Sequence, residues 1–154
     1  MENYICINGK KTELTEEQMK TLGIELPKTS PFNRVKYMRD AYFYIASDGC
    51  VYTDLDGRGN VSNHRFNAAN YCTDKAIMEQ RALHETLSRL LWRFSEQNGG
   101  SGVFSIADKG NGNFCPMIEN YRYLEPTFKT ANIVNRAIEE VIEPFMAEHP
   151  DFVW

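Results

Sequence analysis

Paired cysteines, long apolar runs and export signals are all missing from this 154-residue chain. Its four cysteines lie far apart, at positions 6, 50, 72 and 115, so the C-x-x-C pairs that hold zinc or form a redox dithiol are absent. No run of eighteen apolar residues occurs, and the first residues lack a basic segment followed by an apolar one. We therefore expect reduced thiols, a cytosolic protein and no membrane insertion.

Signatures of catalysis and of phosphate binding are missing as well. The chain contains no G-x-S-x-G, no Walker A loop, no H-E-x-x-H and no G-x-G-x-x-G. Its glycine-rich stretches at 57–60 and 110–113 do not lead straight into a predicted helix, so we interpret them as turns. From these absences we expect no catalytic residues, no metal site and no cofactor.

The charge is modest, with 17 basic and 21 acidic residues and a net charge of −4. Residues 28–100 are mildly basic, whereas the segments on either side are acidic. A domain that binds duplex DNA through phosphates usually has a denser basic face, so the balance argues against nucleic acid as the main ligand. The apolar fraction of 42% is that of an ordinary globular protein.

Turn and cap signals predict the first elements of the fold. Asn8-Gly9 and Asp48-Gly49 each lie between short segments rich in apolar residues, which predicts two β-hairpins. Thr15 and Gln18 have the spacing of a capping box, so a short helix follows the first hairpin and ends at Gly23.

Two longer helices are predicted further along the chain. Residues 55–64 are predicted as a loop and 65–72 as a short strand or turn, after which Thr73 caps a helix that runs to about Asn98. A second apolar stripe predicts a helix that Pro144 bends or ends, leaving an apolar tail that needs a partner surface. The stripe predicted for the first of these helices consists of Ala76, Gln80, Leu83, Leu87, Leu90, Leu91 and Phe94.

The two halves of the chain partly echo each other. Residues 45–49 are similar in sequence to 106–110, and residues 71–73 are similar to 128–130, at offsets of 61 and 57 residues. Either the chain contains a tandem repeat, or both halves obey the same hairpin and cap rules. We predict an α+β fold with two tandem β-hairpin–strand–helix units, 40–98 and 103–147, that form an antiparallel sheet packed by two long helices. An N-terminal hairpin and short helix, 1–27, form an appendage, and 1–154 is a single domain.

A polar ridge on the first long helix is the main candidate site. Arg81, His84 and Arg89 recur there at helical spacing, so they form either a solvated face or a surface that binds an anion or a partner. We add to it polar residues from the segment before the helix. The candidate ligand- or partner-binding residues are Arg65, Asn70, Tyr71, Arg81, His84 and Arg89.

Cys72 is the one candidate nucleophile. It lies beside a helix start, where the helix dipole lowers a thiol pKa, and His64 or His84 are possible bases. Its alternating position, however, predicts that it faces the core, where a cysteine behaves as a small hydrophobe.

Three stretches carry a family resemblance: ICINGKKTELTEEQMKTLGIE, SPFNRV followed by AYFYIASDGCVYTD, and NAANYCTDKAIMEQRALHETLSRLLWRFSEQNGG. Together they resemble an uncharacterised family of small phage and prophage proteins of Gram-positive, mostly clostridial, bacteria. The resemblance implies a phage protein in the host cytoplasm, but it supplies no activity. Small phage proteins without an enzyme signature often act as binders, so by analogy we expect a non-enzymatic protein that binds a host protein or protein–nucleic-acid complex.

By analogy with other phage proteins, we expect an anti-defence inhibitor such as an anti-CRISPR. One alternative is a sponge for a small anionic nucleotide signal, held between the subunits of a homodimer by Arg65, Tyr71, Arg81 and His84. The other is an enzyme that depends on Cys72.

Overall fold

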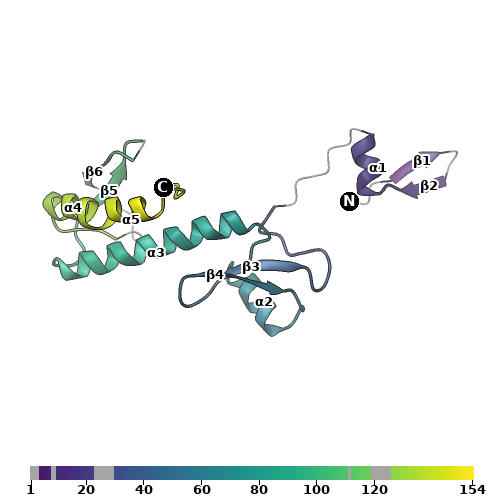
Figure 1. Ribbon diagram of the computed structural model, residues 1–154, viewed down its shortest axis with the longest axis horizontal. Coiled ribbons are helices and arrows are strands. Elements are labelled where there is room, and N and C mark those ends of the chain that lie inside the picture. The colour runs from purple at the N-terminus through teal and green to yellow at the C-terminus, as the bar shows by residue number, and fades with distance from the viewer. Residues whose placement is uncertain (1–3, 8–9, 23–29, 111, 119–125) are drawn as a thin grey trace. The chain divides into compact units, whose positions relative to one another are not determined.

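The computed structural model describes residues 4–7, 10–22, 30–110, 112–118 and 126–154 (Figure 1). The chain divides into two compact units, Met1–Asn33 and Arg34–Trp154. Unit 1 contains strands β1 (Tyr4–Ile7) and β2 (Lys10–Glu13), which pair antiparallel, and helix α1 (Glu16–Thr21).

The capping box predicted before α1 is present. The Thr15 N–H donates to Gln18 Oε1 at 2.9 Å, and the Gln18 N–H donates to Thr15 Oγ1 at 3.3 Å. These reciprocal bonds satisfy two backbone donors that the first turn leaves unpaired. Asn8-Gly9 and Gly23, predicted as the hairpin turn and the helix stop, lie outside the described residues.

Unit 2 confirms the α+β class. Its elements are β3 (Ala41–Ile45), β4 (Val51–Leu55), α2 (Asn60–Asn67), α3 (Lys75–Gln97), β5 (Phe104–Asp108), β6 (Phe114–Ile118), α4 (Ala131–Ala137), a π-helix η1 (Ile138–Ile142) and α5 (Glu143–Glu148). The described strands form three separate two-stranded sheets, β1–β2, β3–β4 and β5–β6, where one sheet was expected. Figure 1 shows β3–β4 and β5–β6 near opposite ends of α3.

The tandem units are visible in how each hairpin of unit 2 is extended. Phe43 of β3 forms an antiparallel bridge with Cys72, and Phe104 of β5 forms one with Phe128. Two residues after each bridge a side chain caps a helix: Asp74 accepts from the Ile77 N–H at 3.2 Å, and Thr130 accepts from the Ile133 N–H at 3.3 Å. The caps are therefore 56 residues apart, and the predicted Thr73 cap is displaced by one residue.

Helix α2 corrects the sequence prediction of a loop and a strand or turn. Its first residue follows Gly59, and no side-chain hydrogen bond caps it. Polar contacts hold it in place: the Ser62 hydroxyl donates to the Gly59 carbonyl, Arg34 donates to Asn63 at 2.7 Å, and Arg65 donates to Asp54 at 2.5 Å. A helix fixed by such contacts needs no apolar stripe, so hydrophobic periodicity does not reveal it.

Helix α3 serves two apolar clusters. Met78 and Ala82, near its start, pack with Ile45 and Cys72. Leu87, Leu91 and Phe94, nearer its end, belong to a larger cluster with the last helices, and Leu83 and Leu90 pack against it. The predicted inward face is therefore right over the second half and wrong at the start, where Ala76 is exposed and Met78 is fully buried. The first hairpin and the larger cluster lie on different sides of α3. One continuous apolar stripe along the helix therefore cannot cover both of them.

The last helical run passes through Pro144. The Glu143 N–H bonds to the Ile138 carbonyl, five residues back, which is the π-type spacing. Pro144 then falls in the first turn of α5, where its missing N–H costs little. Of the two alternatives predicted for Pro144, a bend or an end of the helix, the end does not occur there, because the π turn resets the hydrogen-bond pattern before Pro144 and the helical run continues to Glu148.

The residues after α5 find their partner surface within the same chain. Phe152 is buried and packs edge-to-face on Phe145, with ring centroids 5.4 Å apart. The Gln80 side chain donates to the Asp151 carbonyl at 2.7 Å and accepts from the Val153 N–H at 3.0 Å. This explains why a polar residue lies on the apolar side of α3. None of the helices formed by the described residues has the length and apolar character needed to span a bilayer.

The buried half of α3 gives a stability prediction. Leu87 is 3% exposed, so Leu87→Ala should lower the free energy of unfolding of unit 2 by roughly 2–5 kcal/mol through lost burial and a residual cavity. Ile77→Ala, on the same helix at an exposed position, should change it by only about 0.5 kcal/mol. Urea unfolding followed by far-UV circular dichroism measures both, and equal effects would contradict the assigned packing.

Candidate functional site

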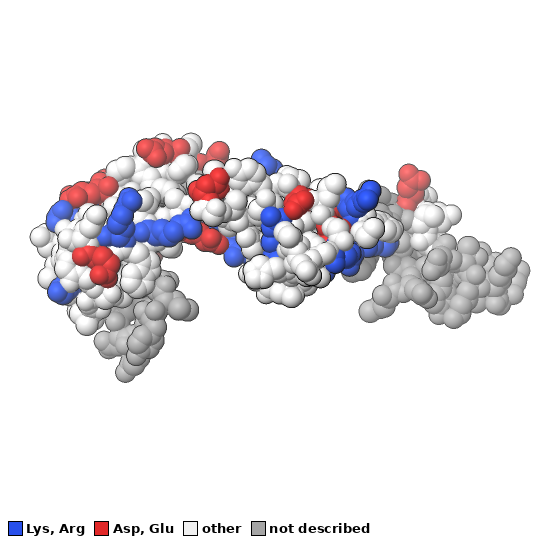
Figure 2. All heavy atoms as spheres, turned by 90° about the horizontal axis from the view of Figure 1, so that it is seen from below, with Lys and Arg blue, Asp and Glu red and all other residues white. Residues whose placement is uncertain are grey.

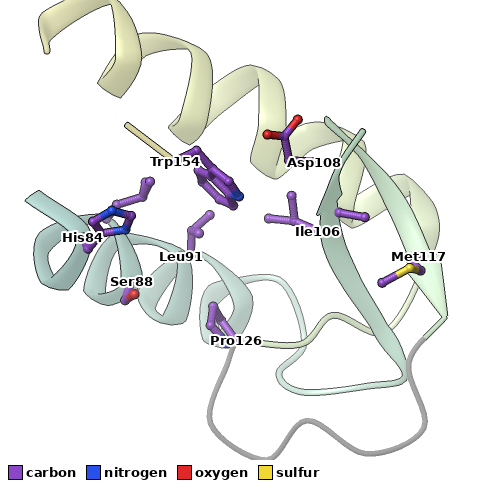
Figure 3. Close-up of a pocket in the computed structure, with 10 residues that line it drawn as sticks. His84, Ser88, Leu91, Ile106, Asp108, Met117, Pro126 and Trp154 are labelled. Carbon is purple, nitrogen blue, oxygen red and sulfur yellow. The ribbon is translucent and has the colours of Figure 1, made fainter. Parts of the chain in front are cut away.

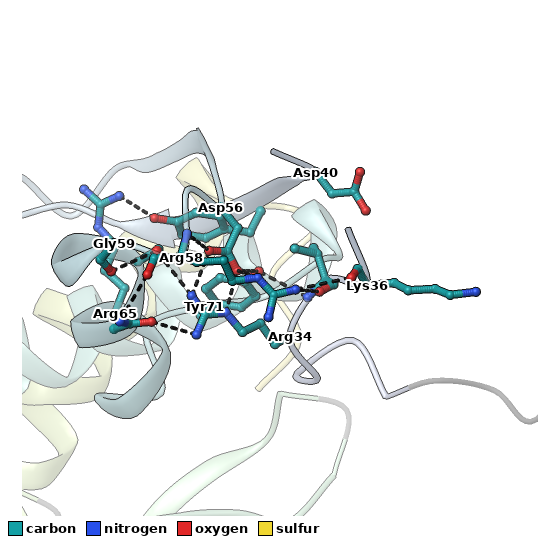
Figure 4. A network of polar contacts seen from close by, with 12 residues as sticks. Arg34, Lys36, Asp40, Asp56, Arg58, Gly59, Arg65 and Tyr71 are labelled. Carbon is teal, nitrogen blue, oxygen red and sulfur yellow. Dashed lines mark hydrogen bonds and ion pairs between the residues drawn. The ribbon is translucent and has the colours of Figure 1, made fainter. Parts of the chain in front are cut away.

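A fully buried carboxylate lies at the centre of a polar network between β4 and the segments around it (Figure 4). Arg34 donates to both oxygens of Asp56, at 2.6 and 2.8 Å. The Tyr71 hydroxyl donates to the same carboxylate at 3.0 Å, and the Arg58 N–H donates at 2.9 Å. The Arg34 guanidinium lowers the pKa of Asp56 well below its ordinary value, and the bonds from Arg58 and Tyr71 act in the same direction.

This network fastens the start of an exposed segment, Lys36–Asp40, which we call the 36–40 loop. The Arg58 side chain donates to the Val35 carbonyl at 2.8 Å and to the Lys36 carbonyl at 3.3 Å. The Tyr71 hydroxyl accepts from the Val35 N–H at 3.2 Å. Arg58 and Tyr71, which both donate hydrogen bonds to Asp56, thus also hold the backbone that enters the loop.

The far end of the 36–40 loop is fastened by backbone bonds to Asp56. The Arg39 N–H donates to the Asp56 carbonyl at 2.8 Å, and the Asp56 N–H donates to the Asp40 carbonyl at 3.0 Å. The Asp40 carboxylate accepts from the Tyr37 N–H at 3.1 Å, which closes the loop on itself. Both ends of the loop are therefore held by hydrogen bonds to Asp56 or to residues that bond to it.

Apolar side chains stand at the tip of this loop. Tyr37 and Met38 are each 62% exposed, and Leu55, which precedes Asp56, is 56% exposed. Arg39 and Arg58 have φ angles of +75° and +54°, a region that residues with side chains rarely adopt. Such strain persists only where the surroundings enforce it, and it is concentrated at functional sites.

The sequence-predicted residues Arg65 and Asn70 hold the first hairpin together. Arg65 donates to Asp54 and to the Tyr42 hydroxyl at 2.5 and 2.7 Å, and its guanidinium lies 3.4 Å from the Tyr44 ring centroid. The Asn70 amide accepts from the Ile45 N–H at 2.8 Å and donates to the Ile45 carbonyl at 2.7 Å. Asn70 thereby continues the pairing along the outer edge of β3.

Tyr71 does not have the role that the nucleotide sponge requires. Its side chain is 2% exposed, one ring face stacks on Tyr42 at 4.2 Å, and Phe66 packs against it edge-on. A ring enclosed in this way has no face on which a base can stack. Tyr71, which the nucleotide-sponge hypothesis places against the ligand, is instead a core residue whose hydroxyl donates to Asp56.

The predicted ridge on α3 is largely occupied by contacts within the chain. Arg81 donates to Glu85 at 2.9 Å and to the carbonyl of Ala69, just after α2. Arg89 donates to Thr86 at 3.3 Å, and the exposed His84 packs its ring 4.7 Å from that of Phe152. Arg65, Asn70, Tyr71 and Arg81 thus meet around the first hairpin and the α2–α3 connection, whereas His84 and Arg89 lie further along α3.

A pocket of about 510 Å³ lies between α3 and the second hairpin (Figure 3). Its apolar wall comes from both elements, and polar groups stand at its rim. Its lining includes Leu91, Ile106 and Met117 as apolar side chains and His84, Ser88 and Asp108 as polar ones, with Trp154 on one side. His84 is the sequence-predicted site residue that reaches this pocket.

Cys72 is enclosed by the first apolar cluster. It is fully buried, and its Sγ accepts from the Asp74 N–H at 3.4 Å. A nucleophile has to reach its substrate, so this burial gives the Cys72 enzyme no support. Within the described residues, His, Cys, Asp and Glu do not gather in groups of three or more that could hold a metal.

The face in Figure 2 shows Lys and Arg side chains interspersed with Asp and Glu over the described residues. Such mixed charge is unlike the dense basic surface of a protein that binds DNA phosphates. Comparisons of the chain with models of protein families, with curated proteins and with solved structures find no match. The function therefore has to be argued from the surface itself.

Asp56→Asn tests the network beneath the loop. The change keeps the shape of the side chain but leaves Arg34 without a charged partner, so the free energy of unfolding should fall by about 3–5 kcal/mol. Asp151→Asn, at an exposed position, is the matched control and should be nearly neutral. Chemical denaturation of both variants measures the difference.

The Arg34–Asp56 ion pair also gives a prediction for the pH dependence of stability. Because folding lowers the pKa of Asp56, its contribution is complete above the unfolded-state pKa of about 4 and is lost as the pH falls toward the folded-state pKa. The stability difference between the wild type and Asp56→Asn should therefore shrink on acidification below about pH 4. A difference that stays constant over this range would contradict an ionised, paired Asp56.

Proposed function

We propose that this chain is a non-enzymatic binding protein and that the 36–40 loop contacts its partner protein. The observation that carries the proposal is the 62% exposure of both Tyr37 and Met38 on a loop fastened at each end to buried Asp56. Tyrosine, methionine and arginine are enriched at protein interfaces. A loop already held in one conformation loses little entropy on binding.

The charge around the loop tip supports a partner with an acidic rim. Arg39 is exposed and the Arg58 side chain is 42% exposed, while Asp40 offsets part of their charge. Asp56 Oδ2 also lies 3.9 Å from Arg58 Nε, but the charge of this carboxylate is balanced mainly by Arg34, whose Nε is 2.6 Å away. A partner surface with an apolar centre and carboxylates at its edge complements this arrangement, since opposite charges raise the association rate and fix the register.

The setting of the proposal comes from the resemblance to small phage and prophage proteins. It supports a partner in the host cytoplasm, and an anti-defence inhibitor, such as an anti-CRISPR, that acts on a host immune protein or complex. The nucleotide sponge and the Cys72 enzyme have less support, because the Tyr71 ring and the Cys72 thiol are both buried.

Capture experiments with paired variants test the loop. The tagged chain should retain a stoichiometric protein from host lysate at mild salt, and the double variant Tyr37→Ala, Met38→Ala should weaken that complex by about 30-fold or more. Tyr52→Ala, a 46% exposed tyrosine on β4, should bind as the wild type does. The loop variant should melt as the wild type does, because both loop side chains point to solvent.

The polar face of α3 is the competing surface. If Arg81→Ala or His84→Ala abolishes capture while the loop variant binds normally, the binding surface is the ridge that the sequence suggested. Failure of the wild-type chain to retain any stoichiometric protein would count against a protein partner altogether.

A further inference from the structure

We infer that the pocket between α3 and the second hairpin binds a small aromatic molecule that carries a cationic amine. Its volume of about 510 Å³ lies in the range of small-molecule sites, which are mostly apolar with a few placed polar groups. The pocket contains none of the residues of the 36–40 loop, so the inference does not rest on the proposed function.

The apolar walls come from elements with a fixed conformation. Leu87 and Leu91 project from α3, where they are 3% and 5% exposed as part of the large apolar cluster. Ile106 faces them from β5 and packs against the same cluster. Walls of branched aliphatic side chains on a helix and a strand favour a flat, apolar ligand body.

Trp154 supplies an aromatic surface to this space. Its ring lies between the α3 side chains and those of β5, as Figure 3 shows. Trp154 stays 40% exposed although its ring packs at an angle against that of Phe114, with ring centroids 4.7 Å apart. Indole is the aromatic side chain that attracts a cation most strongly, and it also stacks well on another ring. Both properties suit an aromatic amine.

The rim determines the sign of the ligand charge. Among the described lining residues Asp108 carries a full negative charge, and none is a lysine or an arginine. Asp108 Oδ1 accepts from the Gly110 N–H at 2.8 Å, and a carboxylate can accept further bonds. His84 and Ser88 add hydrogen-bonding groups from α3. A cation is attracted to this rim, whereas an anionic nucleotide is repelled by it.

Matched probes test both the pocket and the charge. Tryptamine supplies an aromatic ring with an ammonium group, indole-3-acetate supplies the same ring with a carboxylate, and indole supplies the ring alone. Backbone amide NMR shifts of the full chain on titration should place tryptamine at Leu91 and Ile106. Its Kd should be at least about tenfold below that of indole-3-acetate, which corresponds to about 1.4 kcal/mol.

Two variants sharpen the result. Asp108→Asn keeps an acceptor for the Gly110 N–H but removes the charge, so tryptamine should then bind no better than indole. Ser88→Trp places a bulky ring at the pocket and should block all three probes, whereas Glu96→Trp, exposed on the same helix and outside the pocket, should not.

Three outcomes would overturn the inference: no probe shifts the pocket amides at millimolar concentration, indole-3-acetate binds as tightly as tryptamine, or Ser88→Trp still binds. Capture of the partner protein by Ser88→Trp is measured in parallel. Ser88→Trp should capture the partner as the wild type does. In the wild-type chain, capture without probe binding, or probe binding without capture, shows which of the two proposals has failed.

Discussion

A carboxylate with no exposed surface must be paired, and the first half of unit 2 is arranged to pair Asp56. Arg34 comes from the start of the unit, Arg58 from the residues before α2, and Tyr71 from the residues before α3. Three separate segments are thereby fixed to the end of β4. A buried ion pair of this kind adds little net stability, but any arrangement that leaves it unpaired is strongly disfavoured, so it selects one conformation of the chain.

Helix α3 imposes the second constraint. An isolated two-stranded hairpin is marginally stable in water, so each hairpin of unit 2 needs an apolar surface to cover. Met78 covers the first beside Cys72, while Leu87 and Leu91 belong to the cluster that includes residues of the second hairpin. Because the two hairpins use different parts of one 23-residue helix, the described strands do not meet edge to edge and do not form the single sheet predicted from the repeat.

Local signals predicted what local interactions determine: the hairpins, the Thr15 capping box and the extent of α3. They missed α2, whose position depends on Arg34 and Arg65 reaching partners far away in sequence. The candidate site likewise combines features that local sequence signals predict with contacts between residues far apart in the sequence. Helical spacing brought out Arg81 but could not show that it is tied to Ala69. No motif marks Tyr37 and Met38; the one available signal was an apolar pair between two basic residues just before a strand.

The two proposed sites differ in whether they depart from the usual distribution of buried apolar and exposed charged side chains. Around β4 the usual distribution is inverted, with Asp56 buried while Tyr37 and Met38 face solvent, and such departures from consistent folding rules are expected mainly at functional sites. The pocket follows the usual distribution, because its apolar wall consists of side chains of the large cluster, such as Leu87, Leu91 and Ile106, and its polar lining residues are exposed. A ligand there extends the apolar contacts of α3 and should stabilise unit 2 by mass action. A partner at the loop meets a surface whose conformation Asp56 has already set, so its affinity depends on the exposed side chains alone.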